Sequence, residues 1–249
     1  MAEYPPRNIL LTIAYQGTRY SGWQIQPNVP TVQGALERRL EEIAGHACRV
    51  RAAGRTDAGV HALGQLANFV TTSRVPMRGF LRGLNTLLPD DIGVVAVDEV
   101  PMEFDSRRDN HGKSYRYSLW NQRPPSPRDA PYYLHIHKPL DLLAMSRAGR
   151  LLVGTHDFAA FRAANCERET TVRTIFRCTI DHQQPWVHID VVGSAFLKNM
   201  VRIITGTLLQ VGQRKRPPED ILQLLERGDR REAGITVPPQ GLCMVRVFL

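Results

Sequence analysis

The chain has 249 residues, 43% of them hydrophobic, which is enough to bury a core in one large domain or two small ones. A disordered or fibrous protein is therefore excluded. The formal net charge of +8 at pH 7 attracts polyanions, so nucleic acid is the first partner to consider. Only four of the 32 basic residues are lysines. This arginine excess suits phosphate binding, but biased codon usage or life at high temperature explains it equally well.

The cysteines and the hydrophobic runs bear on the cellular compartment. The cysteines lie far apart, without CxxC spacing and without an N-terminal secretory segment, so we expect them to be reduced and buried. No run approaches the roughly 20 apolar residues of a membrane span. We therefore expect a soluble, cytoplasmic protein with no membrane association. The cysteines are Cys48, Cys166, Cys178 and Cys243.

The first part of the chain alternates strand-like and helix-like segments. After Thr31, a good capping residue, apolar residues recur at helical spacing until Gly45. Leu- and Ile-rich runs that end at glycine are typical of strands. The expected elements are a strand at 8–15, a helix between Thr31 and Gly45, strands at 49–53 and 65–71, a helix at 76–87 and a strand at 92–100.

The second part of the chain repeats this order of strand-like and helix-like segments less regularly. It has a proline-rich stretch, RPPSPRDAP (123–131), which we expect to be an exposed loop and the connection between two halves. The other expected elements are strands at 115–120, 171–181, 186–192 and 242–248, helices at 140–153 and 217–226, and an apolar helical stripe from Phe196 to Val211.

The order β-α-β-β-α-β is that of the ferredoxin-like unit, a frequent platform for RNA. We therefore predict an α+β fold of two ferredoxin-like halves, with mainly antiparallel sheets that flank a central RNA-binding cleft. The expected halves are 1–110, which carries the glycine-flanked loop described next, and 111–249, which completes the cleft.

One segment between two expected strands has residues suited to chemistry. Gly54 and Gly59 flank it and let the backbone turn tightly or approach a ligand. Arg55 and Asp57 are two residues apart, so in extended chain they project to one side, where the guanidinium would keep the carboxylate ionised. Asp and Gly are also ordinary turn residues, and such Arg/Asp pairs are often solvated. From these residues alone, both interpretations stay open.

The full segment GRTDAGVHALGQ (54–65) resembles the signature of the TruA family of tRNA pseudouridine synthases. Further segments resemble that family in the same order, so the resemblance covers nearly the whole chain. They are YQGTRYSGWQ (15–24), TVQGALE (31–37), a second motif with Phe104, Arg107, Lys113, Tyr115 and Tyr117, GTHDFAAF (154–161) and SAFLKNMVRIITGTLLQVG (194–212). The chain departs from the family pattern at Gln16, Arg108, Asn110, Gly112 and Gln240, none of which is given a chemical role below.

The resemblance implies that Asp57 is the essential catalytic aspartate. Pseudouridine formation breaks the bond from ribose C1′ to N1, turns the uracil and rejoins it through C5, so no cofactor or metal is implied. A carboxylate can serve by adding to C1′, by adding to C6, or by removing a proton from C2′ to give a glycal. The sequence does not choose among these routes.

Four further residues are implied to bind the substrate. Tyr115 matches the family tyrosine that stacks on the target base, although a core aromatic on a strand is the simpler interpretation. Arg202 matches an arginine near the aspartate. On a helical wheel it shares a polar face with Lys198 and Thr205, where Arg202 would pair with Asp57 and Lys198 would meet phosphate. Arg55 matches an arginine that supports the displaced nucleotide.

The resemblance also implies the substrate and the assembly. The target uridine is flipped out of its stem, a cost that phosphate contacts offset. Positions 38 to 40 of tRNA, in the anticodon arm, are the expected targets. A homodimer is expected, because two basic clefts can grip one large RNA.

Two rival hypotheses come from other classes of protein. A non-catalytic RNA-binding domain fits the charge, but the aromatic RNP motif is missing and such a domain needs no GRTDAG loop. A metal-dependent phosphohydrolase is suggested by three histidines and an aspartate, although the remaining ligands are not at a recognisable spacing. These four residues are His135, His137, His156 and Asp157.

Overall fold

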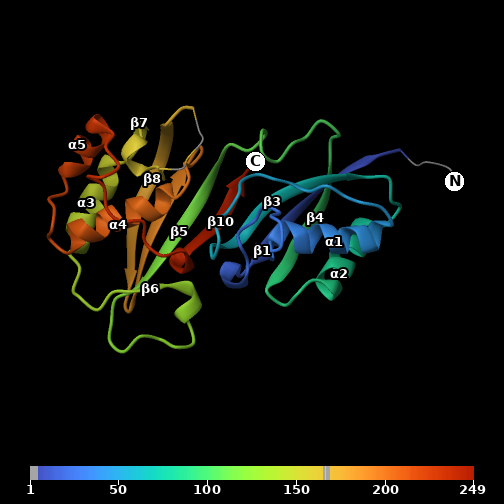
Figure 1. The fold of residues 1–249 in the computed structure, drawn as a ribbon, viewed down its shortest axis with the longest axis horizontal. Coiled ribbons are helices and arrows are strands. Elements are labelled where there is room, and N and C mark those ends of the chain that lie inside the picture. Colours follow the sequence, from blue (N-terminus) through green and yellow to red (C-terminus); the bar gives the residue numbers. More distant parts are fainter. Residues whose placement is uncertain (1–4, 165, 167–168) are drawn as a thin grey trace. The chain divides into compact units, whose positions relative to one another are not determined.

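The computed structural model describes residues 5–164, 166 and 169–249, and the chain forms two compact units (Figure 1). The first unit is Met1–His111 together with Met244–Leu249, and the second is Gly112–Cys243. The proline-rich stretch at 123–131 lies inside the second unit, so it is not the connection that we expected. The expected division of the chain into the domains 1–110 and 111–249 stays a prediction.

The first unit has its central strand β1 (Arg7–Tyr15) antiparallel to both β3 (His61–Thr71) and β4 (Ile92–Val100). The short β2 (Arg51–Ala52) also pairs with β3. Beyond β3 comes β10 (Leu242–Phe248), whose residues from Met244 onward belong to this unit. Strands β1 and β10, which are far apart in the sequence, thus both neighbour β3, the strand that follows the predicted catalytic loop.

Two helices cover this sheet. The helix α1 (Val32–Ala44) is capped by Thr31, whose hydroxyl accepts from the Gly34 N–H at 3.2 Å, and it ends at Gly45 with φ +79°. The second, α2 (Met77–Leu87), packs on α1 and on β4. Their apolar faces are buried, as the helical spacing predicts.

In the second unit the strand order is β5 (Gly112–Trp120), β9 (Trp186–Gly193), β8 (Val172–Gln183) and β7 (Gly154–Asp157). Neighbours in this order are antiparallel, whereas β6 (Leu134–His135) pairs in parallel with β5. The fold is therefore mixed α+β with mainly antiparallel strands.

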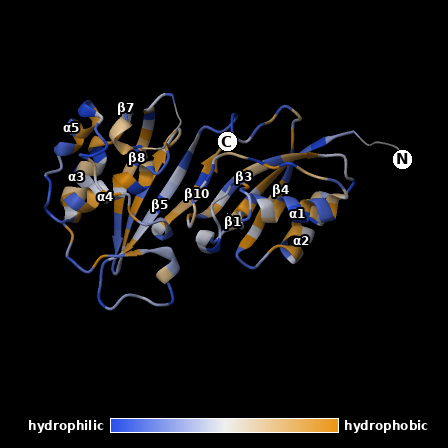
Figure 2. Ribbon diagram, in the orientation of Figure 1, coloured by the Kyte–Doolittle hydropathy of each residue, from blue (hydrophilic) through white to orange (hydrophobic). Residues whose placement is uncertain are grey.

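The helices in the described residues of the second unit are α3 (Leu142–Leu151), α4 (Met200–Gly212) and α5 (Asp220–Arg227). The helix α3 packs on β8, α4 and α5, and α4 also packs on β5. Hydrophobic residues gather along β1, β3 and α4 (Figure 2). Short 3-10 turns lie at Gly17–Arg19, Ala130–Tyr132, Ala159–Phe161 and Pro239–Gly241. No helix in the described ranges has the length and apolar character that crossing a bilayer requires.

Several expectations need correction. The strand β3 begins at His61 rather than 65, so part of the GRTDAGVHALGQ segment is strand. The helix α4 begins at Met200, because the preceding Asn199 is left-handed, with φ +61°. Thr205 is fully buried, so the expected polar face with Lys198 and Arg202 does not form. Of the four cysteines, Cys48 and Cys178 are buried and the other two are half-buried.

Candidate active site

The predicted catalytic loop, 54–60, joins β2 to β3 in the first unit. Arg55 is exposed, Thr56 is buried and Asp57 is half-buried. The turn after Asp57 is closed by the Val60 N–H, which donates to the Asp57 carbonyl at 3.2 Å. Within this turn Gly59 has φ +76°, a conformation that other residues rarely adopt. A tight turn therefore follows the half-buried Asp57.

Hydrogen bonds hold the loop through Thr56 and its neighbours. The Thr56 hydroxyl lies 2.8 Å from the Tyr15 hydroxyl. The Thr56 backbone carbonyl accepts a hydrogen bond from the Trp23 N–H at 3.1 Å. The Gly59 N–H donates to the Tyr20 carbonyl at 3.3 Å. The segment 15–24 thus clamps the loop at two points on either side of Asp57.

Two glycines of the 15–24 segment lie in close contact with the backbone of the loop. A Cβ at Gly17 would lie 2.0 Å from the Val60 carbonyl oxygen, and one at Gly22 would lie 2.6 Å from the Thr56 carbonyl oxygen. Gly22 also has φ +92°. These approaches exclude any side chain, and they give a physical reason for the glycines of YQGTRYSGWQ.

Gln65 and Asp91 form hydrogen bonds with residues of the loop and of the 15–24 segment. The Gln65 side chain is fully buried and donates to the Gly54 carbonyl at 2.7 Å. The Asp91 carboxylate accepts from Arg19 Nε at 2.7 Å and from the Tyr20 hydroxyl at 2.6 Å. Burial alone would raise the pKa of Asp91, but these hydrogen bonds outweigh it and lower that pKa. Our sequence reasoning gave neither residue a role: Gln65 is the last residue of the GRTDAGVHALGQ segment, and no local pattern marks Asp91.

The expected support of Asp57 by Arg55 is absent. Among the described residues of the first unit, no side chain forms an ion pair with the Asp57 carboxylate, and Arg55 is exposed. The expectation assumed an extended chain, in which residues two apart project to the same side. Arg55 and Asp57 instead lie in a loop, where this alternation does not bring the guanidinium to the carboxylate. The assignment of Arg202 as a partner of Asp57 stays a prediction, because Arg202 belongs to the other unit.

In the second unit, Tyr115 lies on β5 and is only 8% exposed. Its ring meets Phe196 edge-on, with 5.0 Å between centroids. Two residues on, Tyr117 is fully buried and donates to the Pro238 carbonyl at 2.7 Å. Burial raises the pKa of Tyr117. Phe196, which we expected on a helix, instead orients Tyr115 from the loop before α4.

The Arg202 guanidinium is held by hydrogen bonds from two of its nitrogens. Its Nε donates to the Val237 carbonyl at 2.7 Å, and one terminal nitrogen donates to the Asn199 side-chain oxygen at 2.7 Å. Lys198 is exposed and precedes α4, so the two cations do not share a helix face. Sequence reasoning also missed Asn199, although asparagine is favoured just before a helix. Its side chain here accepts from Arg202 and does not cap α4.

Two histidines of the phosphohydrolase hypothesis lie within hydrogen-bond distance of nearby backbone carbonyls. His135 Nε2 lies 3.0 Å from the Gln122 carbonyl, and His156 Nε2 lies 3.1 Å from the Val153 carbonyl. The Asp157 carboxylate accepts from the Ala159 N–H. Across the described ranges, no group of three or more His, Cys, Asp or Glu side chains is placed to hold a metal ion. The proposed ligand set is therefore not assembled.

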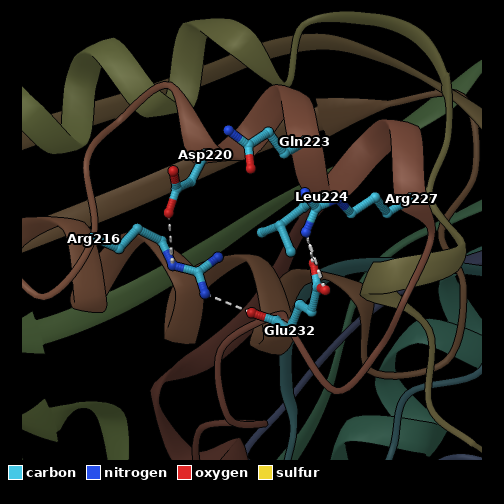
Figure 3. A pocket seen from close by; sticks show the side chains of 6 residues that line it. All are labelled: Arg216, Asp220, Gln223, Leu224, Arg227 and Glu232. Carbon is cyan, nitrogen blue, oxygen red and sulfur yellow. Dashed lines mark hydrogen bonds and ion pairs between the residues drawn. The ribbon is translucent and has the colours of Figure 1, made fainter.

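A surface pocket of about 280 Å³ lies along α5, and Figure 3 shows its side chains. Arg227 pairs with Glu232 at 3.3 Å, and Arg216 lies 4.0 Å from Asp220 and donates to the Glu232 carbonyl. The charged groups thus neutralise one another and leave no unpaired acid or base for chemistry. The lining residues are Arg216, Asp220, Gln223, Leu224, Arg227 and Glu232.

Comparison with known proteins places the chain in a family. A family model described as tRNA pseudouridine synthase matches residues 11–107 and 148–248. The chain belongs to this family. It is therefore an enzyme, an isomerase of the pseudouridine synthase class, and the matched residues include the loop around Asp57.

Relatives align over almost their whole length. A protein of Citrifermentans bemidjiense named tRNA pseudouridine synthase A is 50% identical over 97% of this chain and 97% of its own. Proteins of the same name from Geobacter sp. strain M21 and Myxococcus xanthus are 50% and 46% identical, over 97% and 96% of this chain and 98% and 90% of theirs. A solved Cbf5-Nop10-Gar1 complex matches at 13% identity and a TM-score of 0.30, over 80% of this chain and 54% of that one, too weakly to support an inference.

Proposed function

We propose that this enzyme isomerises uridine to pseudouridine at positions 38 to 40, in the anticodon stem-loop of tRNA, with Asp57 as its catalytic carboxylate. The observation that carries the proposal is the loop around Asp57. Trp23 and Tyr20 hydrogen-bond its backbone and Tyr15 bonds the Thr56 hydroxyl. The carboxylate itself has no ion-pair partner among the described residues of its unit. The name of these relatives, tRNA pseudouridine synthase A, supports the substrate class.

The reaction suits a single carboxylate. The C1′–N1 bond breaks, the C1′–C5 bond forms, C5 loses a proton and N1 gains one, so atoms and electrons balance without a co-reactant. Asp57 can act as a nucleophile at C1′ or C6, or as a base at C2′. A clamped loop favours each of these routes, because a group held in place pays little reorganisation cost during the reaction.

The remaining site residues have proposed binding roles. Tyr115 offers a ring to the target base, and its orientation is set by Phe196. Arg202, already held by two acceptors, approaches the carboxylate as a fixed cation. Arg55 and Lys198 are exposed cations that contact the flipped nucleotide and phosphate.

The proposal also covers the fold of the two halves, the cellular compartment and the assembly. Both halves are ferredoxin-like, an assignment supported by the strand order β4-β1-β3 with β2 on β3, and by β5-β9-β8 in the second unit. The two halves flank an RNA-binding cleft, and the enzyme acts in the cytoplasm as a homodimer. The net charge of +8 supports the RNA partner.

One assay tests this function. Purified protein is incubated with unmodified, pre-folded tRNA transcript in the absence of any cofactor, and pseudouridine is scored at every uridine. We expect product at one or more of positions 38 to 40. Product confined to another part of the tRNA would contradict the anticodon-arm assignment, and no product at all would contradict the function.

A further inference from the structure

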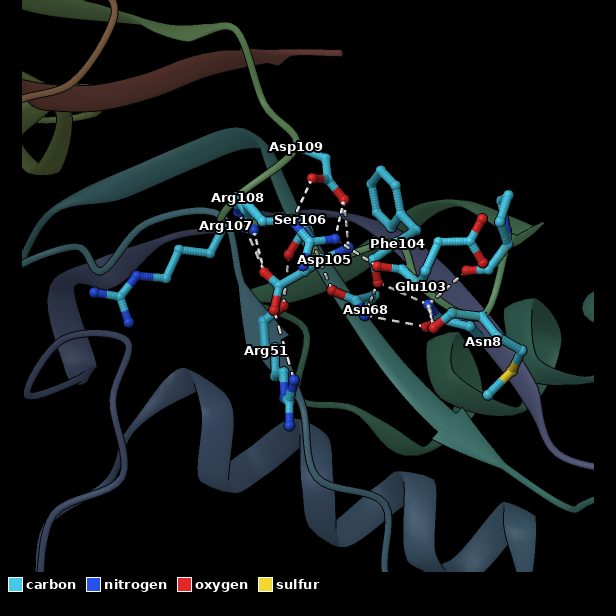
Figure 4. Close-up of polar contacts among 12 residues, drawn as sticks. Asn8, Arg51, Asn68, Glu103, Phe104, Asp105, Ser106, Arg107, Arg108 and Asp109 are labelled. Carbon is cyan, nitrogen blue, oxygen red and sulfur yellow. Dashed lines mark hydrogen bonds and ion pairs between the residues drawn. The ribbon is translucent and has the colours of Figure 1, made fainter.

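The segment 101–110, which follows β4, is fastened to the first unit by buried polar side chains (Figure 4). The Asn8 amide on β1 donates to the carbonyls of Pro101 at 3.0 Å and Phe104 at 2.8 Å. The Asn68 amide on β3 donates to the Asn8 side-chain oxygen at 3.0 Å and to the Phe104 carbonyl at 3.2 Å. Asn8 and Asn68 are 1% and 4% exposed. Buried amides are costly unless satisfied, so this pair holds the segment in one place.

Ser106 extends this attachment to the strands that flank the catalytic loop. Its N–H donates to the Asn68 side-chain oxygen at 3.0 Å, and its hydroxyl donates to the Arg51 carbonyl at 2.7 Å. Arg51 lies on β2, which enters the loop around Asp57, and Asn68 lies on β3, which leaves it. The segment is thus tied to both supports of the catalytic carboxylate.

Within the segment, the backbone at Arg107 is fixed but its side chain is open. The Arg107 N–H donates to the Asp105 carboxylate at 2.8 Å. In contrast to Arg108, which donates to the Asp109 carboxylate and to the Glu103 carbonyl, the Arg107 guanidinium has no hydrogen-bond or ion-pair partner in the described part of the chain. Figure 4 shows it extending away from the polar cluster.

A guanidinium on a rigid loop loses less entropy on binding than one on a mobile loop, and its planar fork matches phosphate. We propose that Arg107 contacts a backbone phosphate of the tRNA substrate, and that Asn8, Asn68 and Ser106 are positioning residues for it. This inference rests on the proposed function for the identity of the RNA. Its readout is binding, which can be measured apart from catalysis.

The test measures tRNA affinity against salt for Arg107→Ala, Arg107→Lys and the matched control Arg82→Ala, which removes an exposed cation from α2. One phosphate contact contributes about 0.7 log units of affinity per decade of salt in single strands and about 0.9 in B-DNA. We expect Arg107→Ala to lower the log–log slope by about 0.7 to 0.9. Its loss of affinity relative to the wild type is then roughly five- to eight-fold greater at 0.1 M salt than at 1 M salt. Arg107→Lys keeps the slope, and Arg82→Ala matches the wild type. At saturating tRNA, kcat is unchanged in Arg107→Ala while KM rises.

A double-mutant cycle tests the positioning role. We expect Asn68→Ala to reduce the slope as Arg107→Ala does, and the double variant to bind no more weakly than Arg107→Ala alone. Ser106→Ala, which removes one hydroxyl, serves in the same cycle if Asn68→Ala does not fold. Additive losses would overturn the positioning role, and a wild-type slope in Arg107→Ala would overturn the phosphate contact. If wild-type protein binds tRNA but forms no pseudouridine, the proposed function fails while the slopes still decide the role of Arg107.

Discussion

Asp57 carries the chemistry of the proposed reaction at the scale of a single residue. We expect Asp57→Asn to abolish pseudouridine formation, because an amide has neither the charge nor the basicity that the step requires. Binding of tRNA persists, since phosphate contacts supply most of the affinity. Stability changes little, because the half-buried carboxylate has no ion-pair partner among the described residues of its unit.

Product yield with enzyme in excess over tRNA, a binding titration and a thermal melt together check this prediction. Asp98→Asn is the matched control, because it removes an exposed carboxylate from β4 in the same unit. Wild-type turnover in Asp57→Asn, or a loss explained by unfolding, would refute the catalytic assignment.

Asp91 predicts a pH dependence of stability. Its folded pKa lies below the ordinary 3.8, because the hydrogen bonds from Arg19 and Tyr20 outweigh burial. The stabilisation is therefore fully present above about pH 4 and declines as the pH falls through the lowered folded pKa. We expect Asp91→Asn to have a lower Tm than the wild type at pH 7, and the difference to shrink below pH 4. A difference in Tm that stays constant from pH 7 to pH 3 would contradict this account.

At the scale of elements, the segment 15–24 and the catalytic loop act as one structure. We expect Gly17→Ala and Gly22→Ala each to lower kcat, since the added Cβ pushes the Val60 or Thr56 carbonyl away and displaces Asp57. A displacement of about 1 Å in a reacting group costs on the order of 100-fold in rate. The measurement is single-turnover pseudouridine formation by variants whose melting curves show a folded state.

The control for these variants is Gly93→Ala on β4. A Cβ there meets only the Asn85 side-chain oxygen at 3.8 Å, an ordinary contact. We expect near wild-type turnover from this variant. If Gly22→Ala were as active as Gly93→Ala, the close approach would not position the catalytic loop.

At the scale of the whole molecule, we expect activity to survive exhaustive chelation. Isomerisation of uridine has no step that calls for a Lewis acid, because the leaving uracil is recaptured by the same ribose. RNA folding can itself need magnesium, so the assay uses pre-folded tRNA. A loss of turnover with EDTA that zinc or manganese specifically restores would reject the cofactor-free mechanism.

Local patterns in the sequence predicted most of the elements. Helical spacing after Thr31, with Gly45 at the end, predicted α1, and strand-like runs predicted β1, β4 and β10 with bounds close to those found. Capping, periodicity and turn chemistry act within a few residues, so the sequence displays them directly. The family followed from the GRTDAGVHALGQ segment, and the family comparison confirmed it.

Only the tertiary structure decided what holds the site in place. The bonds from Asn8 to the Phe104 carbonyl and from Arg19 to Asp91 span 96 and 72 residues, and the Gly17 and Gly22 contacts appear only when two loops meet. Burial of Thr205 depends on how α4 packs, so a helical wheel could not exclude it from a polar face. Short-range preferences set the elements because their partners are neighbours in the chain, whereas the positions of catalytic groups depend on partners that folding brings together.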